Sequence, residues 1–487
     1  MSEQTLKQAT TKGLFWSSVE RFSNQGVQFV FSIILARLLS PSDYGIIAMV
    51  TIFFAVAQSF VDSGFGSALV RKKDRTETDM STCFYFNIVV GGVCYLTLFF
   101  FSPFIASFYS QPILIPIVRI LGLNIIFNSL CIVQGTQFIF KIDFKSIAKI
   151  SLICSILSGI LGVVLANLGY GIWALVWQGV FSTFLRMILL WIFSGWFPKQ
   201  RFSWTSFYYL FGYGSKLLLS YLIGTIYENI YPIVIGKFYS STQLGNYSRA
   251  LGWGQLPSSN ITSVLQRVTF PVLSEMQGEE QRISSNYRRL IRLSAFITFP
   301  LMVVMAAMAA PLIKVVLTDK WDGCIPYLQL ICFALMWYPV HAINLNLLEV
   351  KGRSDLFLRL EIFKKIIGVV IICITIPFGV IAMCWGLIAL SLISFFLNTY
   401  YTGKLIDVGY WTQVRDLVPL LFISFIAGLG SYMSVFFMSS ELLKLLFGSS
   451  IGGIIYFFMA YLFARGDLMY IINIIRRNKS ERPFTSN

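Results

Sequence analysis

The chain has 487 residues, of which 56% are hydrophobic and 12% are charged, with a net charge of +16 and a mean hydropathy of +0.73. A soluble protein normally carries about 25% charged residues, so this composition excludes an ordinary soluble domain. The apolar residues form blocks of about 18 to 25, separated by short polar links, which predicts bilayer-spanning helices. Strand-type alternation over about ten residues is absent, which argues against an outer-membrane barrel.

Taken in chain order, the blocks predict an all-α polytopic membrane protein with about fourteen transmembrane helices. The links between them are short, and none has the length of a folded extramembranous domain. The predicted spans are 15–39, 43–62, 82–105, 114–138, 148–167, 171–195, 208–236, 244–272, 289–316, 324–348, 361–377, 380–402, 416–438 and 442–463.

Lys and Arg residues gather in every second link, beginning with the link that contains Arg71–Arg75. Because basic links stay on the cytoplasmic side, this pattern predicts that both termini are cytoplasmic. The positive net charge then faces anionic lipid headgroups, so it does not indicate a nucleic-acid partner. Further basic positions in these links and at the adjoining ends of the predicted spans are Lys141, Lys145, Lys149, Lys199, Arg201, Arg282, Arg288, Arg289, Arg292, Lys351, Arg353, Lys364, Lys365, Arg476, Arg477 and Lys479.

The eight Cys residues lie almost entirely within apolar blocks, where a thiol usually packs as a small hydrophobic group. No C-x-x-C pair occurs, and the chain contains one His. We therefore expect no disulfide framework, no metal site and no cofactor.

A short stretch of sequence occurs twice. The stretch "IILARLLSPSDYG" from Ile33 to Gly45 is repeated in outline by "IVIGKFYSSTQLG" from Ile233 to Gly245. Each copy joins aliphatic residues to a base, a Ser and a closing Gly. A second echo links "GIWALVWQG" from Gly171 to "GVIAMCWGL" from Gly379. These echoes indicate that the chain contains two copies of one helical unit.

An even number of predicted spans separates the copies, so the two units should be parallel repeats. We predict a six-helix N-terminal lobe over 1–200 and a six-helix C-terminal lobe over 201–407. Two appended helices and a basic cytoplasmic tail would occupy 408–487. Two such lobes around a central cavity are the usual architecture of an alternating-access carrier.

Polar residues inside spans are costly and usually face the bundle interior. They concentrate on the first two spans of each predicted lobe, at helical spacing. Bases there would attract an anion, because a guanidinium presents a planar fork to phosphate oxygens and an ammonium a compact charge. The candidate residues for an anionic head group are Arg21, Lys216, Arg249, Gln25, Gln28 and Asn260, with Arg186 as a further base. Glu228 and Asp62 are the candidates for ion coupling, and we expect no catalytic residue.

The motifs also resemble a known family. "ARLLSPSDYGIIAM", "DSGFGSALVRKKD", "GYGIWALVWQ", "LGNYSRA" and "RVTFPVLSEMQ" are similar to the pattern of bacterial polysaccharide transporters, the Wzx-type flippases of the multidrug/oligosaccharidyl-lipid/polysaccharide exporter superfamily. The resemblance covers nearly the whole chain. It implies a multi-pass protein of the bacterial inner membrane that moves an undecaprenyl-diphosphate-linked oligosaccharide to the periplasmic leaflet. It also implies membrane lipid and export proteins such as a polymerase as partners.

Two other functions are alternatives at this stage. A cation-coupled drug antiporter of the same superfamily would share the two-lobe architecture, but it should place acidic residues centrally, where this sequence has bases. A membrane enzyme such as a polymerase or lipid-sugar transferase should have a long outer loop with paired carboxylates or clustered Arg, and no such loop is evident. We therefore expect a flippase for O-antigen, capsule or exopolysaccharide synthesis, and not an enzyme.

Overall fold

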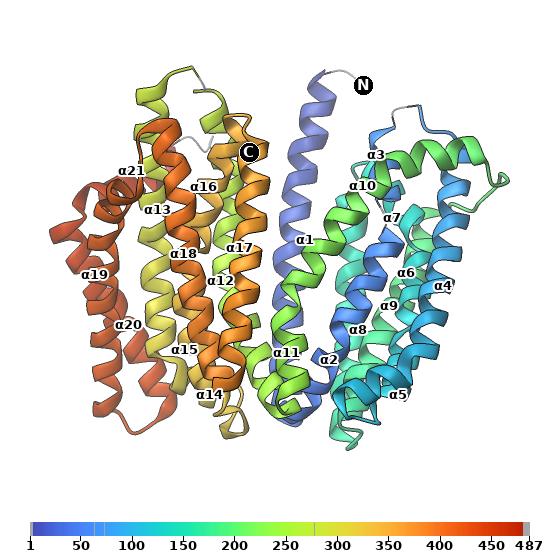
Figure 1. Ribbon diagram of the computed structural model, residues 1–487, viewed down its shortest axis with the longest axis horizontal. Coiled ribbons are helices and arrows are strands. Elements are labelled where there is room, and N and C mark those ends of the chain that lie inside the picture. The colour runs from blue at the N-terminus through green and yellow to red at the C-terminus, as the bar shows by residue number, and fades with distance from the viewer. Residues whose placement is uncertain (1–2, 63, 73, 277, 481–487) are drawn as a thin grey trace, which may run out of the picture. The chain divides into compact units, whose positions relative to one another are not determined.

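The computed structural model describes residues 3–62, 64–72, 74–276 and 278–480. Within these ranges the regular structure is entirely helical and contains no strand (Figure 1). The chain divides into two compact units, residues 1–245 and residues 246–487, here called the first and the second unit. The prediction of an all-α protein is confirmed, while the predicted lobe boundaries at 200 and 407 stay predictions.

The first unit begins with the long helix α1 and contains ten further complete helices. Its last residues start α12, which continues into the second unit. The helices are α1 (Glu3–Leu38), α2 (Pro41–Asp62), α3 (Phe65–Arg71), α4 (Glu77–Tyr109), α5 (Leu114–Leu121), α6 (Leu123–Ser129), α7 (Ile132–Phe140), α8 (Phe144–Asn167), α9 (Ile172–Ser194), α10 (Trp204–Glu228), α11 (Ile230–Phe238) and α12 (Ser241–Ser274).

The second unit contains the remaining helices, including the predicted appended pair. Three short 3-10 turns lie at the ends of α14, α17 and α19. The helices are α13 (Glu280–Ala307), α14 (Ala309–Val316), α15 (Cys324–Leu335), α16 (Tyr338–Val350), α17 (Ser354–Thr375), α18 (Val380–Ile406), α19 (Tyr410–Ser434), α20 (Glu441–Phe463) and α21 (Arg465–Ser480).

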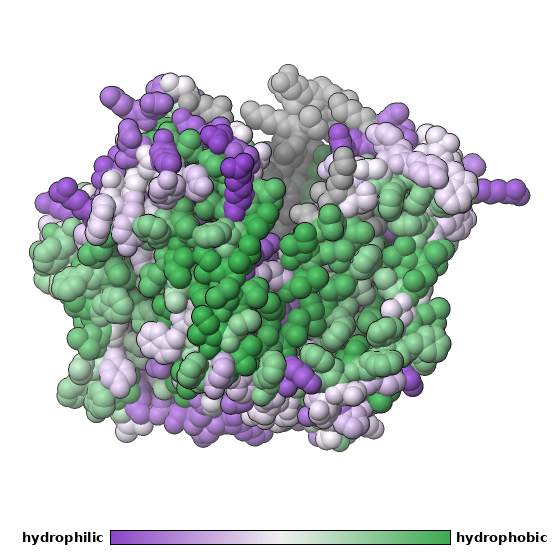
Figure 2. Space-filling model, viewed as in Figure 1, coloured by the Kyte–Doolittle hydropathy of each residue, from purple (hydrophilic) through white to green (hydrophobic). Residues whose placement is uncertain are grey.

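Each predicted span coincides with a helix or with a run of consecutive helices. In the described part of the chain, nine helices are long and apolar enough to cross a membrane, and the bent run α5–α7 makes a tenth candidate. Hydrophobic side chains cover the middle of the visible surface of each unit, and hydrophilic ones gather toward its ends (Figure 2). The protein is therefore a polytopic membrane protein, although fourteen as the number of spans stays a prediction.

The helices that miss the apolar criterion include α1, α10 and α12. These three contain Arg21, Lys216 and Arg249, respectively. A helix that is too polar for lipid contact on all sides must turn its polar stripe toward protein or water. Three of the helices that depart from ideal spans are thus helices for which the sequence predicts a binding role, while α17 departs without such a prediction.

The repeated sequence stretch forms the same local structure twice. Ser40 precedes α2, and its Oγ accepts a hydrogen bond from the Asp43 amide at 3.3 Å while its own amide donates to the Asp43 carboxylate at 2.9 Å. Before α12, the Gln243 amide donates to the Ser240 Oγ at 3.2 Å, and the Ser240 amide donates to the Gln243 Oε1 at 3.3 Å. Both are capping boxes, so the shared Ser is a helix start in each copy.

Ion pairs join the C-terminal helices to the rest of the second unit. Arg288 on α13 binds the Asp416 carboxylate of α19 through two hydrogen bonds of 2.7 Å. Arg292, one turn further along α13, pairs with Asp467 of α21. A bidentate Arg–carboxylate pair fixes both distance and orientation. Helices α19 and α21 are therefore held against α13 within this unit.

The capping boxes generate a stability prediction. We expect Ser40→Ala and Ser240→Ala each to lose about 1 kcal/mol, because each leaves one helix-start amide, that of Asp43 or Gln243, without its side-chain acceptor. Thermal unfolding of the purified protein in detergent should show a lower midpoint for both variants. Ser450→Ala, an exposed position inside α20, should show no loss because Ala favours the helix. A similar decrease in all three variants would contradict the capping role.

Candidate functional site

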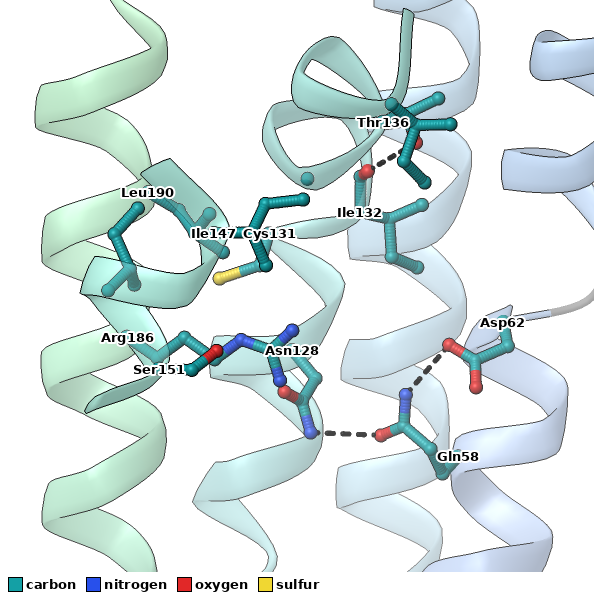
Figure 3. A pocket seen from close by; sticks show the side chains of 13 residues that line it. Gln58, Asp62, Asn128, Cys131, Ile132, Thr136, Ile147, Ser151, Arg186 and Leu190 are labelled. Atoms are coloured by element: carbon teal, nitrogen blue, oxygen red, sulfur yellow. Dashed lines mark hydrogen bonds between the residues drawn. The ribbon is translucent and has the colours of Figure 1, made fainter. Parts of the chain in front are cut away.

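A polar cavity of about 530 Å³ lies inside the first unit, between α2, α6, α7, α8 and α9 (Figure 3). Five aliphatic side chains line it together with six polar residues, of which Thr136 is one. We call it the Arg186 cavity. Its polar lining residues include Gln58, Asp62, Asn128, Ser151 and Arg186.

A chain of hydrogen bonds crosses one side of this cavity. The Asn128 amide donates to the Gln58 Oε1 at 3.0 Å, and the Gln58 Nε2 donates to the Asp62 Oδ1 at 2.9 Å. Gln58 and Asp62 are one turn apart on α2, so the helix itself brings them together. The amide of Gln58 thereby holds the Asp62 carboxylate in one orientation at the end of α2.

Arg186 provides positive charge in the cavity. Its side chain is exposed and extends from α9 toward Asn128 in Figure 3. No carboxylate oxygen of the described residues lies within 4.0 Å of its nitrogens. A guanidinium within a membrane-spanning helix is costly unless water or an anion accompanies it. The arrangement is therefore suited to accept an anionic or hydroxyl-rich group.

A second cavity, of about 700 Å³, adjoins the first and is formed by α2, α3, α7 and α10. We call it the Arg71 cavity, after the base at the end of α3 that lines it. Asp62, Ile132, Thr136 and Ile139 line both cavities. The Asp62 carboxylate, which was a coupling candidate from sequence, therefore stands where the two cavities meet.

The predicted polar stripe of α1 lies against α8, beside the Arg186 cavity. The Gln28 Nε2 donates to the Ser155 Oγ at 3.5 Å, and Ser151 donates to the Glu20 carboxylate at 3.3 Å. Gln25 is half-buried on the same helix, and Arg21 is exposed. The structure thus places the helix that carries Arg21, Gln25 and Gln28 beside a wall of the Arg186 cavity.

The other predicted residues lie elsewhere in the fold. Glu228 is the last residue of α10 and is exposed; Pro232, four positions on, cannot donate to its carbonyl, which favours the break between α10 and α11. Lys216 belongs to α10, but its side chain lies outside the described residues. Arg249 and Asn260 are half-buried on α12 in the second unit, where the Arg249 guanidinium lies 5.3 Å from the ring centre of Trp321.

Sequence reasoning missed the roles of Asn128 and Ser151. Both occur singly, and neither belonged to a polar stripe that the spacing revealed. The sequence marks Gln58 and Arg186 more clearly as polar positions within spans. Gln58 precedes Asp62 by one helical turn, and Arg186 is a single base within an apolar block. Within the described residues, no group of three or more His, Cys, Asp or Glu side chains could hold a metal ion.

Comparison with known proteins decides the family. The model of the polysaccharide biosynthesis protein family matches residues 34–326, more than half of the chain. The chain belongs to this family. The chain is similar to the teichuronic acid biosynthesis protein TuaB of Bacillus subtilis, 25% identical over 86% of this chain and 87% of that protein. The succinoglycan biosynthesis transport protein ExoT of Rhizobium meliloti is 24% identical over 96% of both chains.

Similarity extends to the lipopolysaccharide biosynthesis protein WzxC of Escherichia coli, 22% identical over 87% of this chain and 89% of that protein. Among solved structures, lipid II flippase MurJ in an inward closed conformation matches with a TM-score of 0.76 at 14% identity, covering 93% of this chain and 99% of that one. An inward-facing multidrug resistance MATE transporter matches with a TM-score of 0.60 at 14% identity, covering 79% of this chain and 96% of that one. These two structural matches show that the chain shares its fold with MurJ and with the MATE transporter.

The Arg186 cavity generates a test of its charge and its access to water. In a Cys131→Ala background, which removes the native thiol of the wall, Ser151→Cys should react with small water-soluble thiol reagents. Ser158→Cys, buried two turns along the same helix, should not. Arg186→Gln should slow reaction of Ser151→Cys with an anionic reagent by about fivefold, roughly 1 kcal/mol of attraction, and leave a neutral reagent unchanged. If Arg186→Gln left the rate of reaction with the anionic reagent unchanged, that result would contradict a cationic cavity.

Proposed function

We propose that this protein is a flippase that moves an undecaprenyl-diphosphate-linked oligosaccharide from the cytoplasmic to the periplasmic leaflet by alternating access. Family membership and the folds of MurJ and MATE transporters support a carrier of this superfamily. The names of TuaB, WzxC and ExoT support a role in the synthesis of a cell-surface polysaccharide. The single observation that carries the proposal is a cavity among apolar helices, lined by a base, a carboxylate and four uncharged polar residues, in a protein of this family.

The chemistry of the cavity suits the head group. A diphosphate and a row of hydroxyls cannot enter about 30 Å of hydrocarbon without partners that replace water. Arg186 offers charge-assisted donors, while Gln58, Asn128 and Ser151 offer side chains that both donate and accept. The polyprenyl tail needs no such partners and can remain in the lipid. No covalent step is required, so we propose a carrier and not an enzyme.

We assign the anionic head group to the bases Arg21, Lys216 and Arg249, to which the cavity adds Arg186. Gln25, Gln28 and Asn260 would contact sugar hydroxyls as amide partners. Asp62 and Glu228 are the proposed coupling residues. Asp62 is favoured among the two because it lies between two cavities and is hydrogen-bonded by Gln58.

We place the protein in the bacterial inner membrane with both termini cytoplasmic, as the distribution of Lys and Arg predicts. Membrane lipid would surround it, and a polymerase or another export protein would take the product. The specific argument for the alternative, a cation-coupled antiporter, is the fold shared with a multidrug transporter together with the carboxylate of Asp62.

Translocation in proteoliposomes tests the proposal directly. An undecaprenyl-diphosphate-linked oligosaccharide with a reporter on its sugar should become accessible on the opposite leaflet only when the protein is present. We expect Arg21→Ala, Lys216→Ala and Arg186→Ala each to lower the rate roughly ten- to a hundredfold, since a hydrogen bond to a charged group is worth about 1.5–3 kcal/mol. Cation flux with no lipid translocation would favour the antiporter.

Coupling requires a separate measurement. If Asp62 exchanges an ion for cargo, Asp62→Asn should abolish the dependence of the rate on an imposed proton or sodium gradient and leave a slow, gradient-independent rate. Glu279→Gln, at an exposed carboxylate outside the spans, is the matched control and should keep the gradient dependence. A gradient response that survives Asp62→Asn and is lost in Glu228→Gln would assign coupling to Glu228.

A further inference from the structure

The start of α10 carries several aromatic side chains that the protein leaves uncovered. Trp204, Tyr208 and Tyr209 have exposed fractions of 65%, 68% and 59%. Figure 1 shows the first turns of α10 lying across one end of the first unit, where α10 packs against α3 and α4. Large rings with a polar atom favour the headgroup region of a bilayer, which is apolar on one side and wet on the other. The start of α10 therefore has the composition of a helix at a membrane surface.

Hydrogen bonds hold the chain just before α10 against the first turns of α4. The Trp196 indole donates to the Glu77 carboxylate at 2.7 Å, and the Ser203 amide donates to the Thr82 Oγ1 at 3.0 Å. Ser203 also caps α10, since its Oγ accepts a hydrogen bond from the Ser206 amide at 3.5 Å. The fold of the first unit therefore fixes where the exposed rings of α10 begin.

Two arginines beside the start of α10 lie over aromatic rings. The Arg71 guanidinium is 4.6 Å from the centre of the Tyr213 ring of α10, and the Arg75 guanidinium is 3.7 Å from the centre of the Phe140 ring of α7. Among the residues that the structure describes, no carboxylate oxygen lies within 4.0 Å of the nitrogens of either arginine. A ring beneath a guanidinium fixes its plane and leaves N–H groups at its edge to bind an anion.

The lysine between these arginines has a structural role. The Lys72 ammonium lies 4.9 Å from the centre of the Tyr209 ring and pairs with the buried Asp79 carboxylate at 2.8 Å. Arg75 donates to the Lys72 carbonyl at 3.2 Å, which ties the link after α3 to the end of that helix. Lys72 therefore has its counter-ion within the protein, and Arg71 and Arg75 provide the positive charge that remains.

We propose that this corner of the first unit, here called the Arg75 patch and comprising Arg71, Arg75, Phe140, Tyr209 and Tyr213, binds the headgroup of an anionic phospholipid. The two guanidinium groups would contact the phosphate, and the exposed rings of α10 would lie among neighbouring headgroups. In the proposed topology the basic link after α3 is cytoplasmic, and that face of the membrane is negatively charged. Because Arg71 also lines the Arg71 cavity, the bound lipid would lie at the edge of that cavity.

Binding of phosphatidylglycerol to the purified full chain in a neutral detergent tests the patch. We expect this lipid to raise the midpoint of thermal unfolding in a saturable way, and phosphatidylcholine with the same chains, or inorganic phosphate, to raise it far less. Arg75→Gln should lower the apparent affinity for phosphatidylglycerol about tenfold, because a hydrogen bond to a charged group is lost. Arg359→Gln, which removes an exposed base from α17, is the matched control and should keep the affinity.

The rings give a second test that leaves every charge in place. Phe140→Leu removes the ring beneath Arg75 and should weaken phosphatidylglycerol binding about threefold, as expected for the loss of one cation–π contact at a surface. Tyr170→Leu, an exposed position before α9, should leave the affinity unchanged. Unfolding midpoints measured without lipid would show that each variant is folded.

The outcomes separate the phospholipid site from other ligands and from the proposed function. The same affinity in the wild type, Arg75→Gln and Phe140→Leu would overturn the patch. A shift of equal size with inorganic phosphate would assign the patch to a free anion, and tighter binding of undecaprenyl diphosphate would assign it to the cargo; either result would overturn the phospholipid site. Because these measurements do not involve translocation, the phospholipid site and the flippase can each fail without the other.

Discussion

The interior of a membrane offers no water to polar groups, and this constraint shapes the whole molecule. In the described residues every regular element is a helix, which satisfies its own backbone. Hydroxyl side chains return their hydrogen bonds to the same helix, as Thr51 does to the Ile47 carbonyl and Thr183 to the Gly179 carbonyl. Arg186 faces a cavity instead, and Asp62, bound by Gln58 of its own helix, lies where two cavities meet, so these positions are the candidates for the functional region.

How far the sequence predicts this structure depends on the range of the interaction. Apolar runs are local, so the helical membrane class and the positions of the spans could be predicted, and the stripe of Arg21, Gln25 and Gln28 follows from spacing alone. The partner of that stripe could not, because Ser155 of α8 meets Gln28 only through tertiary packing. Asn128 and Ser151 join the Arg186 cavity for the same reason, and single polar residues in apolar helices give no pattern to recognise.

The repeated stretch shows both kinds of information in one place. Its Ser and the residue three positions later form a capping box, a local structure that the sequence of either copy specifies. Gly45 and Gly245 have no role within their own helices that would require glycine, since a helix interior favours Ala. Glycine is required at both positions because a Cβ would collide with the carbonyl oxygen of the opposing turn. The repeated stretch therefore reflects a contact between its two copies as well as their similarity in sequence.

The balance of charge in the cavity argues for the kind of cargo. Asp62 already receives a hydrogen bond from Gln58, whereas the described residues place no carboxylate within 4.0 Å of Arg186. Asp62 partly offsets the charge of Arg186 across the same cavity, but a cationic cargo would still meet that base and lose its hydration. An anionic head group would gain an opposite charge in the same place and find amides and a hydroxyl for its sugars. These groups support the proposed diphosphate-linked sugar as the cargo, and Asp62 is the proposed coupling residue.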